Sequence, residues 1–416
     1  MCGISVVNSF PGSIMRRRSF DRFNWQDVLR EIPPSHIATR VSFFLAGFLM
    51  ALWASLVPFV KTALGLDEGA FGAVLLAIGF GALVTMPLSG ILIGRSGAKK
   101  VLAVAVPVAS SLLVAAALVP AALPSTAAVV VILFCFGAFF GAIDVGMNIH
   151  SVVVEARSGR KLLSGFHALY SIGGVAGAGL MTLLQTAGLP GVGSACALSM
   201  LSAVVWLFAG RAMLPDAGRN AESDGHGGPK FVFPKGVVLF LGAVCFILFL
   251  VEGSILDWGA LFLMDEKGAA LEHAGMGFAI FSVAMTVMRF VGDRVIMAIG
   301  PKRTVVFGAA AAALAFVLAV LSPNAWTAAA AFFLVGLGTA NIVPIAFAAT
   351  GEQKEMPMSL AMSAATTLGY AGLLTGPAAI GVLAEATSLS TAFLCEAVLL
   401  AAVAAAADLT SVFRKA

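Results

Sequence analysis

The sequence predicts an all-α membrane protein with twelve transmembrane helices in two six-helix, pseudo-symmetric halves. Apolar residues make up 60% of the 416-residue chain and charged residues only 11%, and the mean hydropathy is +1.01. The apolar residues occur in long runs, and one polar stretch near the middle divides these runs six and six. This composition excludes an ordinary soluble domain, which needs far more charge on its surface.

Each predicted span is justified by its length. A helix needs about 20 mostly apolar residues to cross the hydrocarbon core of a bilayer. We expect helices because an open strand edge would leave backbone hydrogen bonds unmade in lipid. In chain order, the spans are expected at 37–61, 70–94, 101–122, 125–152, 163–185, 191–212, 236–260, 271–294, 303–322, 326–350, 357–384 and 389–410.

The domain organisation follows from these spans. The central stretch 213–235 combines prolines, glycines and charges of both signs, which is typical of a linker. The predicted parts are a cytoplasmic tail at 1–36, a six-helix half at 37–212, the cytoplasmic linker at 213–235, a second six-helix half at 236–410 and a tail at 411–416.

The basic residues indicate the topology. With the N-terminus in the cytoplasm, 22 of the 25 lysines and arginines fall in cytoplasmic segments, the exceptions being Lys61, Lys267 and Arg289. Positive charge is retained on the cytoplasmic side of membrane proteins. We therefore expect a multi-pass protein of a bacterial inner membrane with both termini cytoplasmic. The arginines at 16–18 are interpreted as part of this pattern, and no nucleic-acid partner is expected.

Two loops of similar sequence join spans 2 and 3 and spans 8 and 9. Ser89–Lys100 reads SGILIGRSGAKK, and Gly292–Arg303 reads GDRVIMAIGPKR. At an offset of 203 residues, a glycine, a lysine and a final basic residue coincide. Both loops are cytoplasmic in the predicted topology, so the halves are expected to be parallel repeats, an architecture found in secondary transporters.

The first of these loops carries a family resemblance. Gly90-x-x-x-Gly94-Arg95-x-Gly97-x-Lys99-Lys100 resembles the loop 2–3 signature of the major facilitator superfamily, which usually has aspartate at the place of Gly94. Asp144 and Glu155 are considered as replacement partners for Arg95. The resemblance implies a cytoplasmic gate at Gly90, Arg95, Gly97, Lys99, Lys100, Asp293 and Arg294.

Spans 4 and 5 carry the polar residues that are most costly to place in lipid. Asp144 and Asn148 are one helical turn apart on a shared face, as are His167 and Tyr170. Ionisable residues inside spans commonly mark substrate or proton pathways. Two interpretations of Asp144 stay open, uptake of a proton and an ion pair with Arg95. Asn148, His167 and Tyr170 are candidate substrate contacts. Helix packing is the alternative for Asn148, and proton relay or a hydrogen-bonded interfacial position are the alternatives for His167.

Within the superfamily, the chain resembles the fucose:proton symporter-like group and a related, poorly characterised branch of inner-membrane transporters. IDVGMN at 143–148 is similar to the span 4 pattern of the symporter group, and this implies proton coupling through Asp144. RFVGDR at 289–294 and NIVPIAF at 341–347 also have counterparts there. The acid that the fucose symporter has in span 1 is missing, which argues against fucose as the substrate.

Four further candidates lie in other spans. Glu252 is a second candidate for proton coupling. Trp53 either stacks on a sugar-like solute or contacts helices and lipid. Asn341 and Tyr370 are candidate polar groups of a substrate cavity. Arg289 either pairs with Glu252 or a substrate, or reaches the cytoplasmic boundary near Asp293, and the boundary is the favoured interpretation.

These residues predict a secondary active transporter, proton-coupled, that moves a small polar, sugar-like solute by alternating access and works as a monomer. Its expected partners are the solute, protons and the lipid bilayer. The alternatives are an efflux carrier for amphipathic compounds and a non-transporting receptor on the same fold. The sequence has no G-x-x-x-x-G-K-[ST], H-E-x-x-H or C-x-x-C motif. We therefore expect no enzyme activity, no cofactor and no metal.

Overall fold

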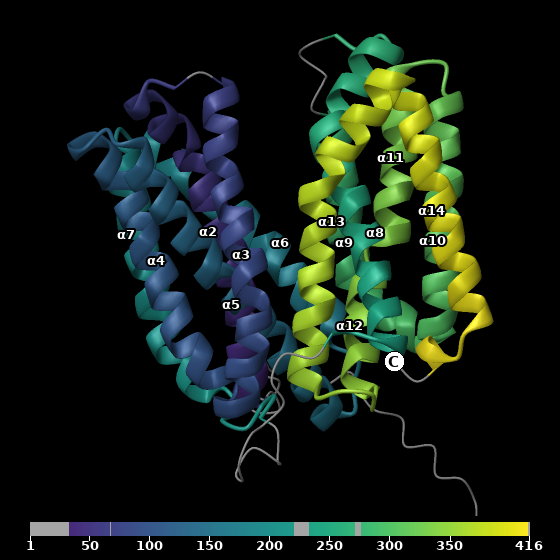
Figure 1. The fold of residues 1–416 in the computed structure, drawn as a ribbon, viewed down its shortest axis with the longest axis horizontal. Coiled ribbons are helices and arrows are strands. Elements are labelled where there is room, and N and C mark those ends of the chain that lie inside the picture. The colour runs from purple at the N-terminus through teal and green to yellow at the C-terminus, as the bar shows by residue number, and fades with distance from the viewer. Residues whose placement is uncertain (1–32, 67, 220–232, 271–275, 415–416) are drawn as a thin grey trace, which may run out of the picture. The chain divides into compact units, whose positions relative to one another are not determined.

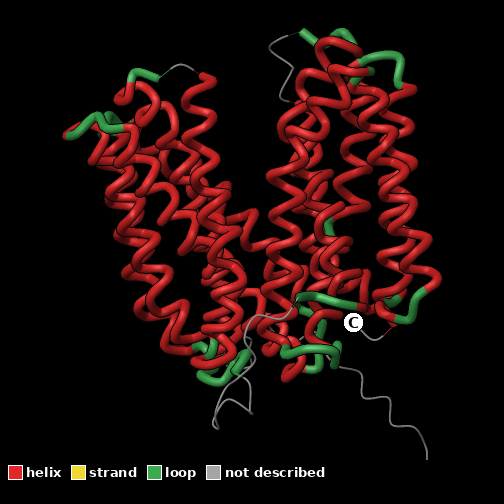
Figure 2. Tube along the Cα trace, in the orientation of Figure 1, coloured by secondary structure: helices red, strands yellow, loops and turns green. Residues whose placement is uncertain are grey.

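The long apolar runs of the sequence form helices. The computed structural model describes residues 33–66, 68–219, 233–270 and 276–414, and within these ranges there is no strand (Figure 2). Twelve helical segments are long and apolar enough to cross a membrane. The predicted fold class and number of spans are therefore confirmed. Pro34–Ala416 form one compact unit.

Figure 1 shows the helices of the two halves. The N-terminal half contains α2 Pro34–Leu64, α3 Glu68–Ser96, α4 Ala98–Ala122, α5 Thr126–Ser158, α6 Leu163–Thr186 and α7 Gly191–Ala209, followed by the short turn η1 Gly210–Ala212. The C-terminal half contains α8 Gly236–Leu261, η3 Phe262–Glu266, α9 Met276–Ile299, α10 Pro301–Leu321, α11 Ala325–Thr339, α12 Ile342–Glu352, α13 Met358–Ala386, α14 Leu389–Leu409 and η5 Val412–Arg414.

The repeat seen in the sequence reappears in the backbone. Gly97 and Gly300 precede α4 and α10 with the same φ of 84°, a conformation that favours glycine. Lys99 Nζ donates to the carbonyl of Arg211 at 2.6 Å, and Lys302 Nζ donates to the carbonyl of Asp408. We call the end of the helices that carries Gly97 and Gly300 the linker end.

Each half is held together by a close helix contact at a glycine. A Cβ atom at Gly173 in α6 would collide with the Phe44 carbonyl of α2, and one at Gly372 in α13 would collide with the Phe246 carbonyl of α8. Small residues permit such close backbone approach in membranes. The two contacts occupy corresponding places in the two repeats.

The tenth span differs from the prediction of one continuous helix. It is interrupted at residues 340–341, between α11 and α12. Pro344 explains the position of the break, because its ring excludes the carbonyl of residue 340 and it has no N–H to donate. Proline is tolerated in the first turn of the new helix α12.

The first residues of the linker bind to the N-terminal half. Leu214 N donates to His150 Nε2 at 2.9 Å, and His150 Nδ1 contacts Thr39 Oγ1 at 2.9 Å. Since Nε2 accepts, the His150 ring is neutral and carries its proton on Nδ1. Arg157 bonds Asp216 at 2.6 Å, and this bond lowers the pKa of the Asp216 carboxyl. Residues 16–18, interpreted above as part of the topology pattern, lie outside the described residues.

Candidate functional site

Five half-buried polar side chains from both halves interact electrostatically in the middle part of the helices. This central polar cluster consists of Asp144 in α5, Tyr170 in α6, Glu252 in α8, Arg289 in α9 and Tyr370 in α13. Tyr170 interacts electrostatically with the three charged members. Tyr370 interacts with Asp144, Glu252 and Tyr170. By their positions along the helices, the members lie roughly 10–24 Å from the linker end, with Tyr170 nearest to it and Glu252 farthest.

Asp144 lies in the cluster and is bonded to Asn148. Asn148 Nδ2 donates to the Asp144 carbonyl at 2.9 Å and to Asp144 Oδ1 at 3.4 Å. The amide oxygen of Asn148 is buried and has no hydrogen-bond partner among the described residues. Arg95 is exposed one residue before the end of α3. Asp144 lies about 21 Å along α5 from the linker end, so the two do not pair in this conformation.

Arg289 does not extend to the boundary, so that expectation was wrong. Its Nη1 donates to Ser171 Oγ in α6 at 3.3 Å, and the guanidinium interacts electrostatically with Glu252. The carboxylate of Asp293 is engaged elsewhere, with the backbone of α6. Burial explains this orientation, because a cation inside the bundle is stabilised by the nearby acid. The Nε atom of Arg289 is buried and has no hydrogen-bond partner in the described part of the chain.

His167 lies beside Arg289 and interacts with it electrostatically. The ring contacts Phe43 at 5.0 Å and, across the two halves, Phe347 at 6.0 Å between centroids. The Nε2 atom is buried and finds no partner within the described ranges. His167 therefore extends the cluster towards the linker end.

Two other predicted contacts lie away from the cluster. Trp53 is 5% exposed and packs on Phe136 in the core of the N-terminal half, which fits the helix-contact interpretation. Asn341 lies at the break before α12, where it packs on Gly292 of α9. The structure thus brings together Asp144, Asn148, His167, Tyr170, Glu252 and Tyr370, and leaves Trp53 and Asn341 apart.

At the linker end, two carboxylates cap the first turn of α6. Glu155 Oε2 accepts from the N–H groups of residues 162 and 163 at 2.7 and 3.0 Å. Asp293, from the other half, accepts from Ser164 N at 3.1 Å and Gly165 N at 3.0 Å. Backbone N–H groups at a helix start favour negative charge. Asp293 therefore joins α9 to α6 across the two halves.

The other predicted gate residues have different surroundings. A Cβ atom at Gly90 would lie 2.5 Å from Ser363 Cβ in α13, so α3 and α13 meet closely there. Gly97 contacts the linker at Pro215, and Lys99 contacts η1 at Arg211; neither of these contacts is with the opposite half. The remaining three side chains, Arg95, Lys100 and Arg294, are exposed.

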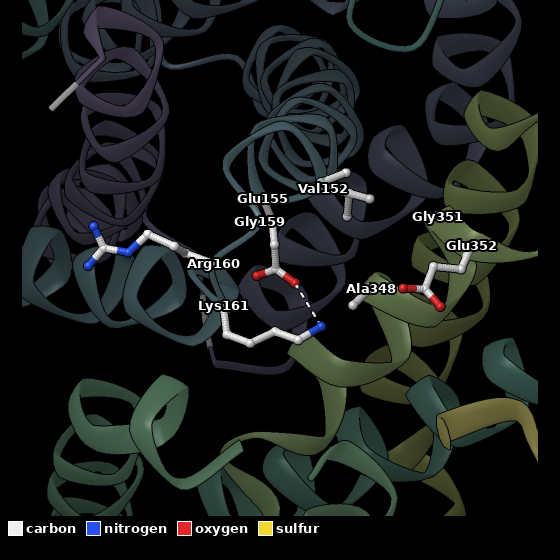
Figure 3. Close-up of a pocket in the computed structure, with 9 residues that line it drawn as sticks. Val152, Glu155, Gly159, Arg160, Lys161, Ala348, Gly351 and Glu352 are labelled. Carbon is white, nitrogen blue, oxygen red and sulfur yellow. Dashed lines mark hydrogen bonds and ion pairs between the residues drawn. The ribbon is translucent and has the colours of Figure 1, made fainter. Parts of the chain in front are cut away.

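A cavity of about 250 Å³ lies between the halves at the linker end. Figure 3 shows Lys161 and Glu352 on opposite sides of it, with Lys161 bonded to Glu155 at 3.5 Å. Glu155 is therefore engaged with Lys161 and the α6 backbone and is not a partner for Arg95. The cavity walls come from α5, the loop before α6, and α12.

Sequence reasoning missed two residues, Ser171 and His150. His150 is fully buried in the same span as Asp144, and a histidine inside an apolar span is the signal that identifies it. Ser171 carries no such signal, because serines are common at membrane helix contacts. Among the described residues, no group of three or more His, Cys, Asp or Glu side chains is placed to hold a metal ion.

Two parallel six-helix repeats around a central polar cluster define a membrane transporter fold. The sequence profile of the Major Facilitator Superfamily matches residues 258–415. An uncharacterised MFS-type transporter of Yersinia pestis is 44% identical over 371 residues, which cover 89% of this chain and 94% of that protein. This chain belongs to the major facilitator superfamily, whose members are transporters and not enzymes.

Solved structures agree with this fold. The fucose:proton symporter of E. coli matches with a TM-score of 0.73 at 17% identity, covering 90% of this chain and 98% of that one. The proton:xylose symporter XylE matches with a TM-score of 0.71 at 14% identity, covering 89% and 94%. At these identities the likeness concerns the fold alone.

Proposed function

We propose that this chain is a proton-coupled secondary transporter that moves a small polar solute by alternating access. The observation that carries the proposal is the central polar cluster, in which Asp144 meets groups from both halves. A carboxyl group at this depth can take up and release a proton when its surroundings change. The moving bodies are the predicted halves 37–212 and 236–410.

The unpartnered polar atoms around the cluster favour a polar solute. Arg289 Nε can only donate, Asn148 Oδ1 can only accept, and His167 Nε2 does either according to its tautomer. A sugar-like molecule satisfies all three because each hydroxyl both donates and accepts. The fucose and xylose substrates in the names of the two structural neighbours support the same class.

The orientation of the chain rests on its basic residues. With both termini in the cytoplasm of a bacterial inner membrane, the linker end faces the cytoplasm. The contacts of Asp293 with α6 and of Gly90 with α13 then close the cytoplasmic side. We infer that the solute reaches the cluster from the opposite side in this conformation, and that a monomer suffices.

The proposal is tested with Asp144→Asn in proteoliposomes under an imposed pH gradient, with a panel of labelled pentoses and hexoses. We expect gradient-driven accumulation to fall at least ~10-fold, equivalent to about 1.4 kcal/mol, while exchange of solute without a gradient persists. Asp257→Asn is the matched control, because Asp257 is an acidic residue in a membrane span, α8, but is exposed. This variant should accumulate the solute as the unaltered chain does. Unchanged accumulation by Asp144→Asn would show that Asp144 does not couple transport to protons.

The direction of transport separates the proposal from its alternative. A carrier of amphipathic compounds would extrude such compounds against the gradient and ignore the sugars. A receptor on this fold would bind a solute without flux. Either result would replace the proposed function.

A further inference from the structure

A groove on the outer surface of the C-terminal half lies apart from the central polar cluster. It has a volume of about 360 Å³ and is formed by α9, α10 and α11. Phe307, Leu314 and Leu318 on its α10 wall are 61%, 59% and 44% exposed. In a chain that crosses the membrane, exposed apolar side chains of this kind face lipid. The groove is therefore open to the acyl chains of the bilayer.

The groove is polar only near the linker end. Gly308 of α10 and Gly338 of α11 touch, so they lie at one level. Thr304 is about 6 Å and Asn341 about 4.5 Å nearer the linker end, at 1.5 Å per residue. Both line the groove. Its polar end therefore lies one turn from the start of α10, where the apolar core of the membrane gives way to headgroups.

Asn341 supplies an unsatisfied hydrogen-bond acceptor at that polar end. Its side chain is 3% exposed, and the amide oxygen has no partner among the residues described. A buried acceptor without a donor costs on the order of 1–3 kcal/mol. The oxygen lies against Gly292, on the α9 face between the lining residues Met288 and Val295. An occupant of the groove that carries an O–H or N–H group and displaces this contact would remove the cost.

Charge at the mouth of the groove favours an anion. Arg303 is exposed and lies four residues before Phe307, on the same face of α10. Its neighbour Lys302 is already paired with Asp408 at 3.2 Å. No acidic residue occurs among the described residues that line the groove.

The groove is long enough to cover a whole acyl chain of one leaflet. From Thr304 to Leu318 the α10 wall extends about 21 Å, against about 15 Å for half of the hydrocarbon core. We propose that this groove binds one anionic phospholipid with a hydroxyl-bearing headgroup. The acyl chain lies along α10, the phosphodiester meets Arg303, and a headgroup hydroxyl donates to Asn341.

The test uses the purified full chain in detergent with phosphatidylglycerol or phosphatidylethanolamine added. Native mass spectrometry counts retained lipids, and a thermal-shift titration measures stabilisation. We expect phosphatidylglycerol to be retained through delipidation and to raise the melting temperature in a saturable way. Phosphatidylethanolamine should do so at least ~10-fold less effectively, a difference of about 1.4 kcal/mol.

Three variants locate the lipid. Ala311 is exposed and lines the groove, so Ala311→Phe fills it and should abolish the retained phosphatidylglycerol. Ala310→Phe, at the adjacent exposed position outside the lining, should bind as the unaltered chain does. Arg303→Gln changes only the mouth and should erase the preference for phosphatidylglycerol. Retention by Ala311→Phe, or equal binding of both lipids by the unaltered chain, would overturn the proposal.

Discussion

The two helix pairs that join the halves differ in chemistry although they occupy corresponding places in the repeat. Gly90 and Asp293 are 203 residues apart, the offset of the two similar loops. On α9, the Asp293 carboxylate bonds two backbone N–H groups of α6. On α3, Gly90 has no side chain, and its backbone lies directly against α13.

This difference shows that two repeats of similar sequence can form corresponding contacts by different interactions. The contact of α6 with α9 depends on a charge at a helix start, which is directional and is lost when the helices separate by a few ångströms. The contact of α3 with α13 depends on shape, and it tolerates sliding as long as no side chain intrudes. The first is suited to hold a closed gate, and the second to guide movement.

The largest effect is expected from Asp293→Asn. Loss of the charge weakens both bonds to α6 and should favour separation of the linker ends by about 2–3 kcal/mol. Spin labels at Arg160→Cys and Lys354→Cys, in a chain without its native cysteines, measure the distance across the gate by pulsed electron paramagnetic resonance. Arg294→Gln, at the exposed neighbour, should keep the original distance distribution. An unchanged distribution in Asp293→Asn would show that the contact does not hold the gate.

A smaller effect is expected from Gly90→Ala. The new methyl group would lie 2.5 Å from Ser363 Cβ and 2.8 Å from the Ser359 carbonyl, so α3 and α13 must separate. Overpacking of this kind costs about 1–2 kcal/mol and should lower the melting temperature. Gly179→Ala in α6 is the control, because nothing lies within 4 Å of its added Cβ. Equal stability of the two variants would contradict close packing at Gly90.

The smallest effect is expected from Ser363→Ala. Ser363 Oγ donates to the Met86 carbonyl at 2.6 Å across the two halves. Loss of this hydrogen bond should cost about 1 kcal/mol and leave the gate distance unchanged, because packing persists. Thermal unfolding and the same pair of spin labels check both statements. A widened gate in Ser363→Ala would mean that the contact depends on this bond and not on shape.

The fold was predictable because membrane spans are set by composition over many residues. The repeat was predictable because its two loops keep their spacing, and Gly97 and Gly300 share one backbone conformation. The break before α12 was also readable from Pro344, although the span was predicted as continuous. All three features can be read from the sequence without knowing how the helices pack against one another.

The candidate site was predictable only in part. Asp144, His167 and Glu252 are costly in lipid, and this cost identified them without knowledge of the fold. For Arg289 the sequence offered both Glu252 and the boundary, and the choice between them was not readable, because Ser171 and Glu252 lie on other helices. The cap that Asp293 places on α6 joins residues 128 or more positions apart, and no local pattern encodes such a pair.

The break in the tenth span has a consequence for local unfolding. The 11-residue α12 is short and is separated from α11 by the break. Part of its packing, at Val152 and His167, belongs to the other half. When the halves part at the linker end, α12 must either find new neighbours or lose its helical hydrogen bonds. Unbonded backbone groups are costly in lipid, so either rearrangement of α12 would add to the energy barrier between conformations.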